Sequence, residues 1–139
     1  MAGYSGRSTV QKLGIEPGFR IFVDGPSVAY GDVVGELPDG VRIAKAAKAP
    51  LDMVHLFASE AKGLAAKLRG YRKAIAPDGM IWLSWPKKAS GVATDVTETV
   101  IRETALANGL VDVKVCAIDG VWSGLKLVIP VKDRAKATR

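Results

Sequence analysis

A loop rich in lysine follows a short apolar segment in the middle of the chain. The apolar segment is Met80 to Trp85, and it leads into Pro86-Lys87-Lys88-Ala89-Ser90-Gly91. Ammonium groups and the backbone N–H groups of a Ser-Gly loop can bind a phosphate or carboxylate, and a tryptophan ring can stack on a planar ligand. The alternative, which the sequence favours, is a tryptophan in the core and solvated lysines. The candidates for this anion site are Trp85, Lys87, Lys88, Ser90 and Gly91.

Trp122 and Lys126 form a second pair of candidates near the end of the chain. They lie in an apolar run that we expect beside the strand 80–85, so they could face the same end of the sheet as Trp85 and Lys87. The alternative is an aromatic pair that stabilises a hairpin edge by about 0.2–1 kcal/mol. The sequence favours this alternative, and both residues are kept as candidates for ligand binding.

Asp24 and Gly25 follow the first apolar strand and are the third candidate. In an open α/β sheet, ligands bind just beyond the carboxyl ends of the strands, which is where this pair lies. Asp24 either contacts a ligand or caps the next helix, and the sequence supports the two interpretations equally. Two other reactive residues are interpreted as structural, His55 as a hydrogen-bonded strand residue and Cys116 as a buried apolar one. The sequence shows no metal-ligand cluster, no complete phosphate loop and no nucleophile–base signature, so no catalytic or metal-binding residue is assigned.

Apolar periodicity predicts the elements that position these candidates. The strands are predicted at 19–23, 41–44, 51–57, 80–85, 111–118 and 121–131, and the last two are joined by Asp119-Gly120, a strong hairpin signal. Helices are predicted at 9–13, at 26–37, at 59–76 with Ser59 as N-cap, and from Asp95 to about 107. Pro77-Asp78-Gly79 is expected to end the third of these helices. Strand–helix alternation followed by a hairpin predicts a single α/β domain over residues 1–139, with a mainly parallel sheet and an antiparallel edge.

Composition narrows the class of protein. The 139 residues are 48% hydrophobic and 24% charged, with one cysteine and a net charge of +6. Residues 1–7 are interpreted as a flexible lead, and residues 132–139 as a basic tail with four basic residues and one acidic residue, which holds half of that charge. No apolar run approaches the roughly 18 residues of a membrane span, and no secretory signal is recognised, so we expect a cytoplasmic protein without a membrane partner. Nucleic acid is disfavoured as a partner because the basic residues of the helix 59–76 lie on several faces without interleaved aromatic residues.

The order of elements resembles the class I methyltransferase fold, an open Rossmann-like three-layer sandwich whose sheet ends in an antiparallel hairpin. The resemblance covers about residues 15–131, and Leu51 to Trp85 is similar to that fold's strand, helix, Pro-Asp-Gly turn and next strand. It implies an S-adenosylmethionine site with an acidic residue and a glycine loop after the first strand, and an acid at the end of the second. Asp24 and Gly25 match this pattern, whereas Pro26 and the bulkier residues after it, and Ala44-Lys45 at the end of the second strand, depart from it. We therefore expect no cofactor, and S-adenosylmethionine in the usual mode is disfavoured.

Four segments are similar to a family of small bacterial proteins known as a domain of unknown function. These segments are 52–57, 82–88, 109–117 and 122–126. This resemblance implies the same fold and no particular activity.

The sequence alone therefore leaves the function unknown, and it leans away from an enzyme. The favoured interpretation is a cytosolic protein with a methyltransferase-like fold that lacks the usual cofactor loop and binds a small anionic ligand. One alternative is a divergent S-adenosylmethionine-dependent methyltransferase, and another is a weak nucleic-acid-associated accessory protein. The oligomeric state is left open, since an apolar or aromatic face on the final hairpin could pair across a homodimer axis but no residue pattern decides it.

Overall fold

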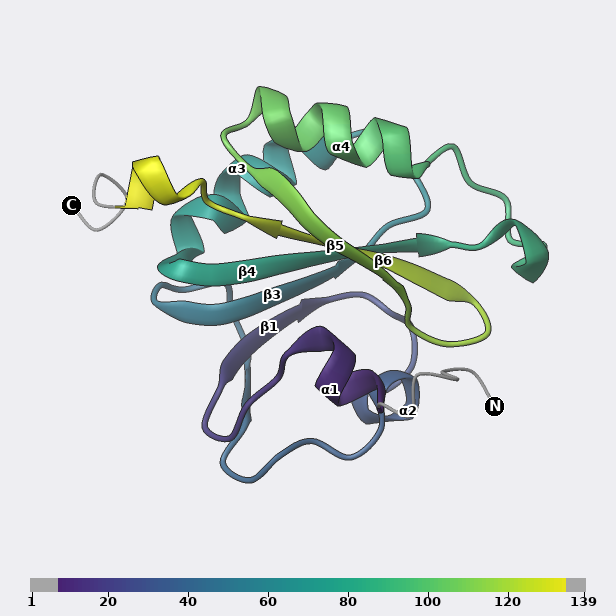
Figure 1. The fold of residues 1–139 in the computed structure, drawn as a ribbon. Helices are drawn as coiled ribbons and strands as arrows, with labels where there is room; N and C mark the ends of the chain where they lie inside the picture. Colours follow the sequence, from purple (N-terminus) through teal and green to yellow (C-terminus); the bar gives the residue numbers. More distant parts are fainter. Residues whose placement is uncertain (1–7, 135–139) are drawn as a thin grey trace.

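Six strands form one sheet in the order β2-β1-β3-β4-β6-β5 in the computed structural model, which describes residues 8–134 (Figure 1). The strands β2, β1, β3 and β4 run parallel to one another, and β6 is antiparallel to both β4 and β5. The predicted mainly parallel sheet with a C-terminal antiparallel hairpin is confirmed. The strands are β1 (Arg20–Asp24), β2 (Arg42–Ala44), β3 (Leu51–Phe57), β4 (Ile75–Pro86), β5 (Val111–Ala117) and β6 (Trp122–Val128).

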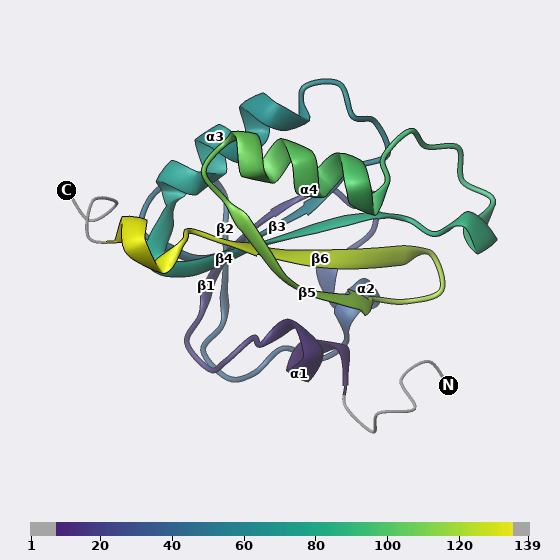
Figure 2. The ribbon, with the colours of Figure 1, turned by 45° about the horizontal axis from the view of Figure 1, so that its top comes forward.

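Helices cover both faces of the sheet, which gives the predicted three layers (Figures 1 and 2). One face carries α3 (Leu64–Ala74) and α4 (Glu98–Ala107), and the other carries the short α1 (Thr9–Leu13) and α2 (Tyr30–Val34). Each layer buries its own apolar cluster against the sheet, with Leu68 and Ile101 on the α3–α4 face and Leu13 and Trp82 on the α1–α2 face. Two short 3-10 helices complete the fold, η1 (Lys88–Ser90) and η2 (Val131–Asp133).

Three helices begin later than the sequence predicts. The helix predicted at 26–37 is only α2, and Gly35 ends it at a φ of +92°. The N-cap of α3 is Gly63 instead of Ser59, and the N-cap of α4 is Thr97, whose side chain accepts a hydrogen bond from the Val100 N–H. Asp95 does not cap α4 because its carboxylate accepts a hydrogen bond from the backbone N–H of Ala61, 34 residues away.

Pro77-Asp78-Gly79 lies inside a strand, so the prediction that it ends a helix is wrong. Helix α3 ends at Ala74, and β4 starts at Ile75. Leu51 pairs with Ile75 and Met53 with Met80, so the extra β4 residues between these pairs bulge out of the ladder. A Cβ atom on Gly79 would lie 3.0 Å from the carbonyl oxygen of Ala76, so the bulge is tight and requires glycine.

The structure describes only part of the basic tail that the sequence predicts, and none of the predicted lead. The flexible lead 1–7 and residues 135–139 of the basic tail lie outside the described residues. The start of the tail is folded, since Lys132 and Asp133 belong to η2 and the Arg134 Nε donates to the carbonyl oxygen of Ile129. Among residues 8–134, no helix is long and apolar enough to cross a membrane.

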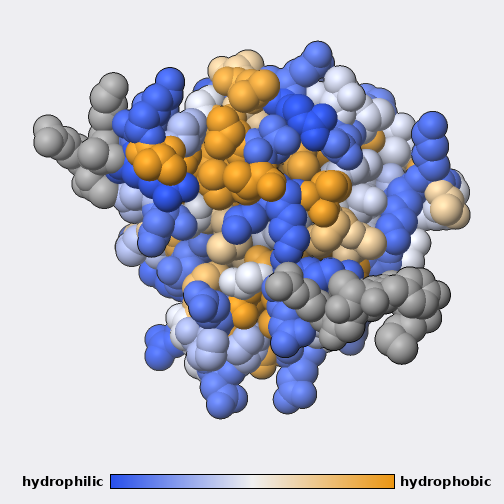
Figure 3. Space-filling model, viewed as in Figure 1, coloured by the Kyte–Doolittle hydropathy of each residue, from blue (hydrophilic) through white to orange (hydrophobic). Residues whose placement is uncertain are grey.

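Apolar side chains gather on the surface where the C-terminal half of α4 and the edge strand β5 lie (Figure 3). Leu106, Val113 and Val115 are more than half exposed in these two elements. The ladder is irregular between Asp112 and Lys114, and both a bulge and an exposed lysine protect an edge strand from pairing. A homodimer that pairs through the final hairpin stays a prediction.

Candidate functional site

The carboxyl ends of β1, β3 and β4 lie at one edge of the sheet, toward the right of Figure 1. The strand β1 lies between β2 and β3, so the chain leaves it in one direction for β2 and reaches β3 on the opposite side. Ligands of open α/β sheets bind at such a reversal of strand order. Asp24 ends β1 here, next to Leu56 of β3. The sequence prediction that this edge holds the candidate site is therefore consistent with the topology.

Helix α3 holds the carboxylate of Asp24. The Nζ of Lys67 lies 3.1 Å from Oδ2, and the hydroxyl of Tyr71 donates a hydrogen bond to the same oxygen. Burial raises the pKa of Tyr71, and the hydrogen bond to Asp24 adds to this rise. No side chain caps α2, so Asp24 is not its cap. No hydrogen bond from residues 8–134 reaches Oδ1, which is therefore the oxygen that can contact a ligand.

Gly25 makes a close turn that no other residue type fits well. Its φ is +73°, in the left-handed region where side chains are strained. A Cβ atom there would lie 3.1 Å from the Cβ of Phe57 and 3.4 Å from the Phe57 carbonyl oxygen. The ends of β1 and β3 therefore come together directly behind Asp24.

A buried row of polar side chains supports this edge. The Tyr30 hydroxyl lies 2.7 Å from the Nδ1 of His55, and the Nε2 of His55 lies 2.8 Å from the Ser84 Oγ. His55 and Ser84 have no exposed surface, and burial lowers the pKa of His55 to about 3. The predicted structural role of His55 is confirmed. A neutral, enclosed imidazole cannot reach a substrate, so it is no general base.

Trp122 lies at the same end of the sheet as Trp85, as the sequence predicts, but the two rings point to opposite faces. Trp85 packs against the α3–α4 cluster, whereas Trp122 packs on the other face with its ring centroid 5.1 Å from that of Phe57. Lys126 pairs with Trp82, four residues before Pro86, and lines a separate open hollow of about 600 Å³ beside α1. Trp122 therefore lies beside the start of the lysine loop, since it pairs with Pro86 and the Lys87 N–H donates to the carbonyl oxygen of Val121, whereas Lys126 lies away from the loop.

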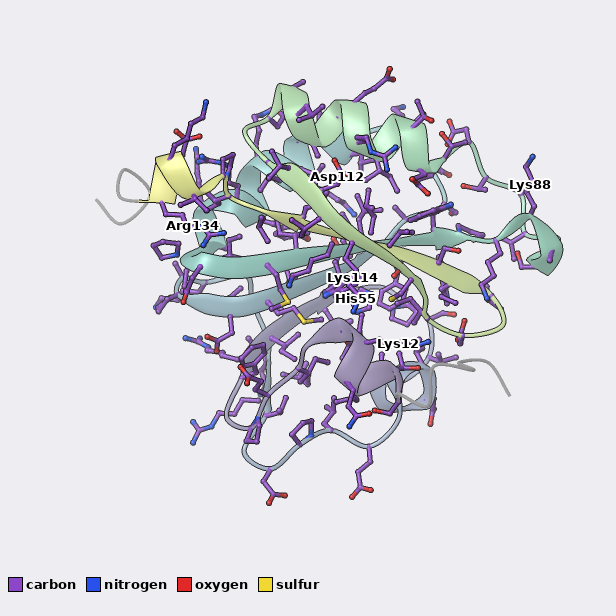
Figure 4. The ribbon with its side chains drawn as sticks, in the orientation of Figure 1. Lys12, His55, Lys88, Asp112, Lys114 and Arg134 are labelled. Atoms are coloured by element: carbon purple, nitrogen blue, oxygen red, sulfur yellow. The ribbon has the colours of Figure 1, made fainter. Side chains whose placement is uncertain are left out.

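The loop after β4 is folded on itself, and this corrects its predicted use as an anion cradle. The backbone N–H groups of Ser90 and Gly91 donate to the carbonyl oxygens of Lys87 and Lys88. The Ser90 hydroxyl donates to the carbonyl oxygen of Lys87 at 2.6 Å and accepts from the Val92 N–H. The Ser90 and Gly91 groups are therefore engaged within the loop, whereas the two ammonium groups remain available to an anion. Figure 4 places Lys88 at the far end of the molecule, away from Lys12 and Lys114 beside α1.

A pocket of about 280 Å³ opens between the end of β4 and the start of α4. The sequence indicated Trp85 and Lys88 here, and missed the wall that Thr94, Val96, Thr97 and Glu98 contribute. Val96 belongs to the buried cluster although it precedes the helix. An apolar residue just before a Thr N-cap is the signal that could have identified this wall.

Cys116 is half-buried instead of fully buried, which departs slightly from the prediction. Burial raises the pKa of its thiol, and the positive charges of Lys12 and Lys114 oppose that rise. Within the described part of the chain, no group of three acidic, histidine or cysteine side chains is placed to hold a metal ion.

Comparisons with solved structures identify the fold. The chain is similar to an S-adenosylmethionine-dependent methyltransferase from Aquifex aeolicus, with 12% identity, a TM-score of 0.61, and 86% of this chain and 87% of that chain covered. It is similar to precorrin-6y C5,15-methyltransferase from Geobacter metallireducens, with 14% identity, a TM-score of 0.58, and 87% and 84% of the two chains covered. Magnesium protoporphyrin IX methyltransferase from Synechocystis, solved with S-adenosylhomocysteine, matches at 14% identity and a TM-score of 0.55, over 86% of this chain and 78% of that chain. The fold is thus that of the class I methyltransferases. No family model and no curated protein sequence matches the chain.

These matches correct two expectations. The favoured interpretation, a cleft that binds an anion in place of the cofactor, is wrong, because the structures that this fold resembles are methyltransferases. The expectation of no S-adenosylmethionine is wrong for the same reason, since four of the matched structures carry that cofactor or its demethylated form. The better-supported interpretation is the alternative, a divergent methyltransferase.

Proposed function

We propose that the chain is a divergent S-adenosylmethionine-dependent methyltransferase that binds its cofactor at the carboxyl ends of β1 and β3. The likeness of fold supports this proposal at the level of architecture. The observation that carries it is the Asp24–Gly25 turn, where a carboxylate with a free Oδ1 precedes a left-handed glycine at the reversal of strand order.

The residues at this edge fit the cofactor in their donor and acceptor chemistry. The cofactor carries an ammonium group and two ribose hydroxyls. These groups donate hydrogen bonds, and the Oδ1 of Asp24 can accept one of them. The side chain of Asp24 is 24% exposed, so the carboxylate is reachable although Lys67 and Tyr71 hold its other oxygen. The missing acid at the end of β2, where Ala44 stands, is the departure that makes the proposed enzyme divergent.

The residues of this chain bind and position the two reactants. When bound, the cofactor supplies an electrophilic methyl group on a sulfonium. Asp24 would hold the cofactor, transfer of the methyl group to a lone pair of the acceptor would leave the electron pair of the carbon–sulfur bond on sulfur, and any proton on the acceptor atom would pass to water. His55 takes no part in proton transfer because it is enclosed. Catalysis would therefore depend mainly on holding the reactants in line.

Titration with S-adenosylhomocysteine tests this proposal. Binding is measured by calorimetry and by the shift in thermal unfolding, and ligand at 100 times its Kd adds about 2.7 kcal/mol to the free energy of unfolding. We expect Asp24→Asn to weaken binding by about tenfold or more, since a hydrogen bond to a charged acceptor is lost. We expect Gly25→Ala to weaken it as well, because the new Cβ displaces Phe57.

Gly18→Ala is the matched control for the glycine variant. Gly18 has a φ of +81° before the opposite end of β1, and no atom lies within 4 Å of a Cβ built on it. It carries the same backbone strain without the contact at the proposed site. No binding by the folded wild-type protein at millimolar ligand would overturn the proposal. Membership of the bacterial family and a cytoplasmic location are separate predictions.

A further inference from the structure

The pocket beside Trp85 lies on the same edge of the sheet as the proposed cofactor site. Trp85 and Pro86 end β4, which is separated from β1 only by β3. Asp24 is level with Leu83, two residues before Trp85, so Trp85 lies about 10 Å from Asp24 across the strands and about 7 Å further along them. A small molecule in this pocket and a ligand at Asp24 would therefore be neighbours along one edge.

Hydrogen bonds tie the loop that follows β3 to the loop that forms the pocket. The Thr94 hydroxyl donates to the carbonyl oxygen of Ser59 at 2.7 Å, and the Ala61 N–H donates to the Asp95 carboxylate at 2.8 Å. The Ala58 N–H donates to the carbonyl oxygen of Ser84 in β4. The pocket is thus attached to the elements of the proposed cofactor site and is not an isolated surface hollow.

The size and the walls of the pocket suit a flat ring. Its volume of about 280 Å³ is roughly twice the ~150 Å³ of an engineered apolar cavity that binds benzene. Trp85, Pro86 and Val96 supply apolar surface, and a tryptophan gains additional energy from an offset or edge-on aromatic partner. One or two fused rings therefore fill the pocket, whereas a larger ring system does not.

The polar groups of the pocket set the remaining chemistry. The Thr94 hydroxyl donates to Ser59 and accepts from the Val96 N–H, and the Thr97 hydroxyl accepts from the Val100 N–H. Glu98 binds Arg102 through Oε2, and no hydrogen bond from the described residues reaches its Oε1. A carboxylate oxygen only accepts hydrogen bonds, so the ligand has to donate one.

The charges at the pocket give an ionised ligand of either sign no net advantage. Lys88 and Glu98 both line it. An ammonium ligand is attracted by Glu98 and repelled by Lys88, and the reverse holds for a carboxylate ligand, so neither recovers the cost of leaving water. An aromatic amine is neutral at pH 7 and still donates an N–H group, so it can pair with Glu98 without that cost.

We propose that this pocket binds the methyl acceptor, and that the acceptor is a neutral aromatic amine of one or two rings. Its ring lies beside Trp85, one N–H donates to Glu98, and the rest of the molecule extends toward the ends of β3 and β1. The role as acceptor depends on the proposed function, whereas the binding chemistry of the pocket does not.

Two-ring probes test the pocket directly. 3-Aminoquinoline has two flat rings and an amino group, quinoline lacks the amino group, and cyclohexylamine is neither flat nor neutral at pH 7. Their Kd values are measured by ligand-observed NMR on the full chain, with and without S-adenosylhomocysteine. We expect 3-aminoquinoline to bind at least tenfold more tightly than each of the other two probes.

Two glutamates on α4 provide a matched pair of variants. Glu98→Gln should weaken 3-aminoquinoline about tenfold and leave quinoline unchanged, since only the charged acceptor is lost. Glu103→Gln, on the same helix and exposed, should change neither Kd. Trp85→Leu should weaken both two-ring probes, provided that its circular dichroism and unfolding temperature show a folded protein.

The failures of the two proposals are distinguishable. Binding of S-adenosylhomocysteine without any binding of 3-aminoquinoline at millimolar concentration overturns the acceptor pocket and leaves the methyltransferase standing. Binding of the probe without S-adenosylhomocysteine overturns the methyltransferase and leaves the pocket as a site for aromatic amines. Equal Kd values for 3-aminoquinoline in the wild type and Glu98→Gln overturn the role of Glu98.

Discussion

Tyr30 donates to or accepts from His55 across 2.7 Å, and this one contact connects helix α2 to the centre of the sheet. The other ring nitrogen of His55 lies 2.8 Å from Ser84 in β4, so the imidazole joins three elements. The ring of His55 also stacks on Phe57, with centroids 4.2 Å apart, directly behind the Gly25 turn. The polar row therefore supports the position of the residues proposed to hold the cofactor.

The stability of the protein should fall between pH 7 and pH 5 because of His55. The pKa of His55 is about 3 in the folded protein, against an ordinary value of 6.5. Between these values the unfolded chain binds the additional proton, so acidification favours unfolding. We expect a loss of about 2 kcal/mol in the free energy of unfolding from pH 7 to pH 5, measured by urea denaturation.

His55→Asn is the control for this pH dependence. The chain has one histidine, so a variant without it should show almost no change in the free energy of unfolding between pH 7 and pH 5. The same slope in the wild type and in His55→Asn would show that another group causes it.

Gly124 lies where the hairpin strand β6 crosses the core, and its substitution should destabilise the protein. A Cβ atom there would lie 2.8 Å from the Cδ1 of Ile118 and 3.2 Å from the Cε3 of Trp82. Both side chains are buried, so Gly124→Ala should cost about 1–3 kcal/mol through overpacking. Gly120→Ala, in the turn of the same hairpin, has no atom within 4 Å of the new Cβ and should change stability by less than about 0.5 kcal/mol. Thermal unfolding of the two variants separates these outcomes, and equal melting temperatures would contradict the predicted crowding.

The strands were predictable because local patterns determine them, whereas several helix starts were not. Leu51–Phe57 has the predicted bounds, since a run of apolar and β-branched residues suits a buried strand wherever it lies. The N-cap of α4 could not be assigned from local residues alone. Asp95 has the right type and spacing for a cap, yet its carboxylate is held by Ala61, a contact that exists only after the chain folds.

The sequence predicted candidate residues that the structure brings together only in part. Asp24, Trp85 and Lys88 lie at one edge of the sheet because strand ends can be read from the sequence. The face to which Trp122 points depends on its pairing with Pro86. The hydrogen bond of the Ser90 hydroxyl within its own loop depends on the turn at η1. Neither pairing nor turn geometry is encoded in the spacing of these residues.

Tyr71 should contribute more to stability than Lys67, although both contact Oδ2 of Asp24. The Lys67 side chain is 49% exposed, and ion pairs of this kind contribute about 0–1 kcal/mol. The Tyr71 hydroxyl is partly buried, and hydrogen bonds to charged groups contribute about 1.5–3 kcal/mol before any discount for exposure. We therefore expect Tyr71→Phe to lower the free energy of unfolding by about 1–2 kcal/mol, and Lys67→Met by less than 1 kcal/mol. Chemical denaturation measures both, and a larger loss for Lys67→Met would show that the charge, and not the hydroxyl, holds Asp24.

Arg102 joins the start of α4 to the edge strand, and its contribution should depend on salt. Its guanidinium contacts Glu98 at 2.5 Å and Asp112 at 3.0 Å, and these partners raise the pKa of the arginine. All three side chains are partly exposed, so the ion pairs are screened by salt, with a screening length of about 3 Å at 1 M against 10 Å at 0.1 M. Arg102→Gln should lower the melting temperature at low ionic strength, and the difference from the wild type should shrink in 1 M NaCl. Arg69→Gln is the matched control, because Arg69 donates to the neutral amide oxygen of Asn108 and its effect should not change with salt. A salt-independent difference for Arg102→Gln would show that the packing of the arginine stem, and not its charge, connects α4 to β5.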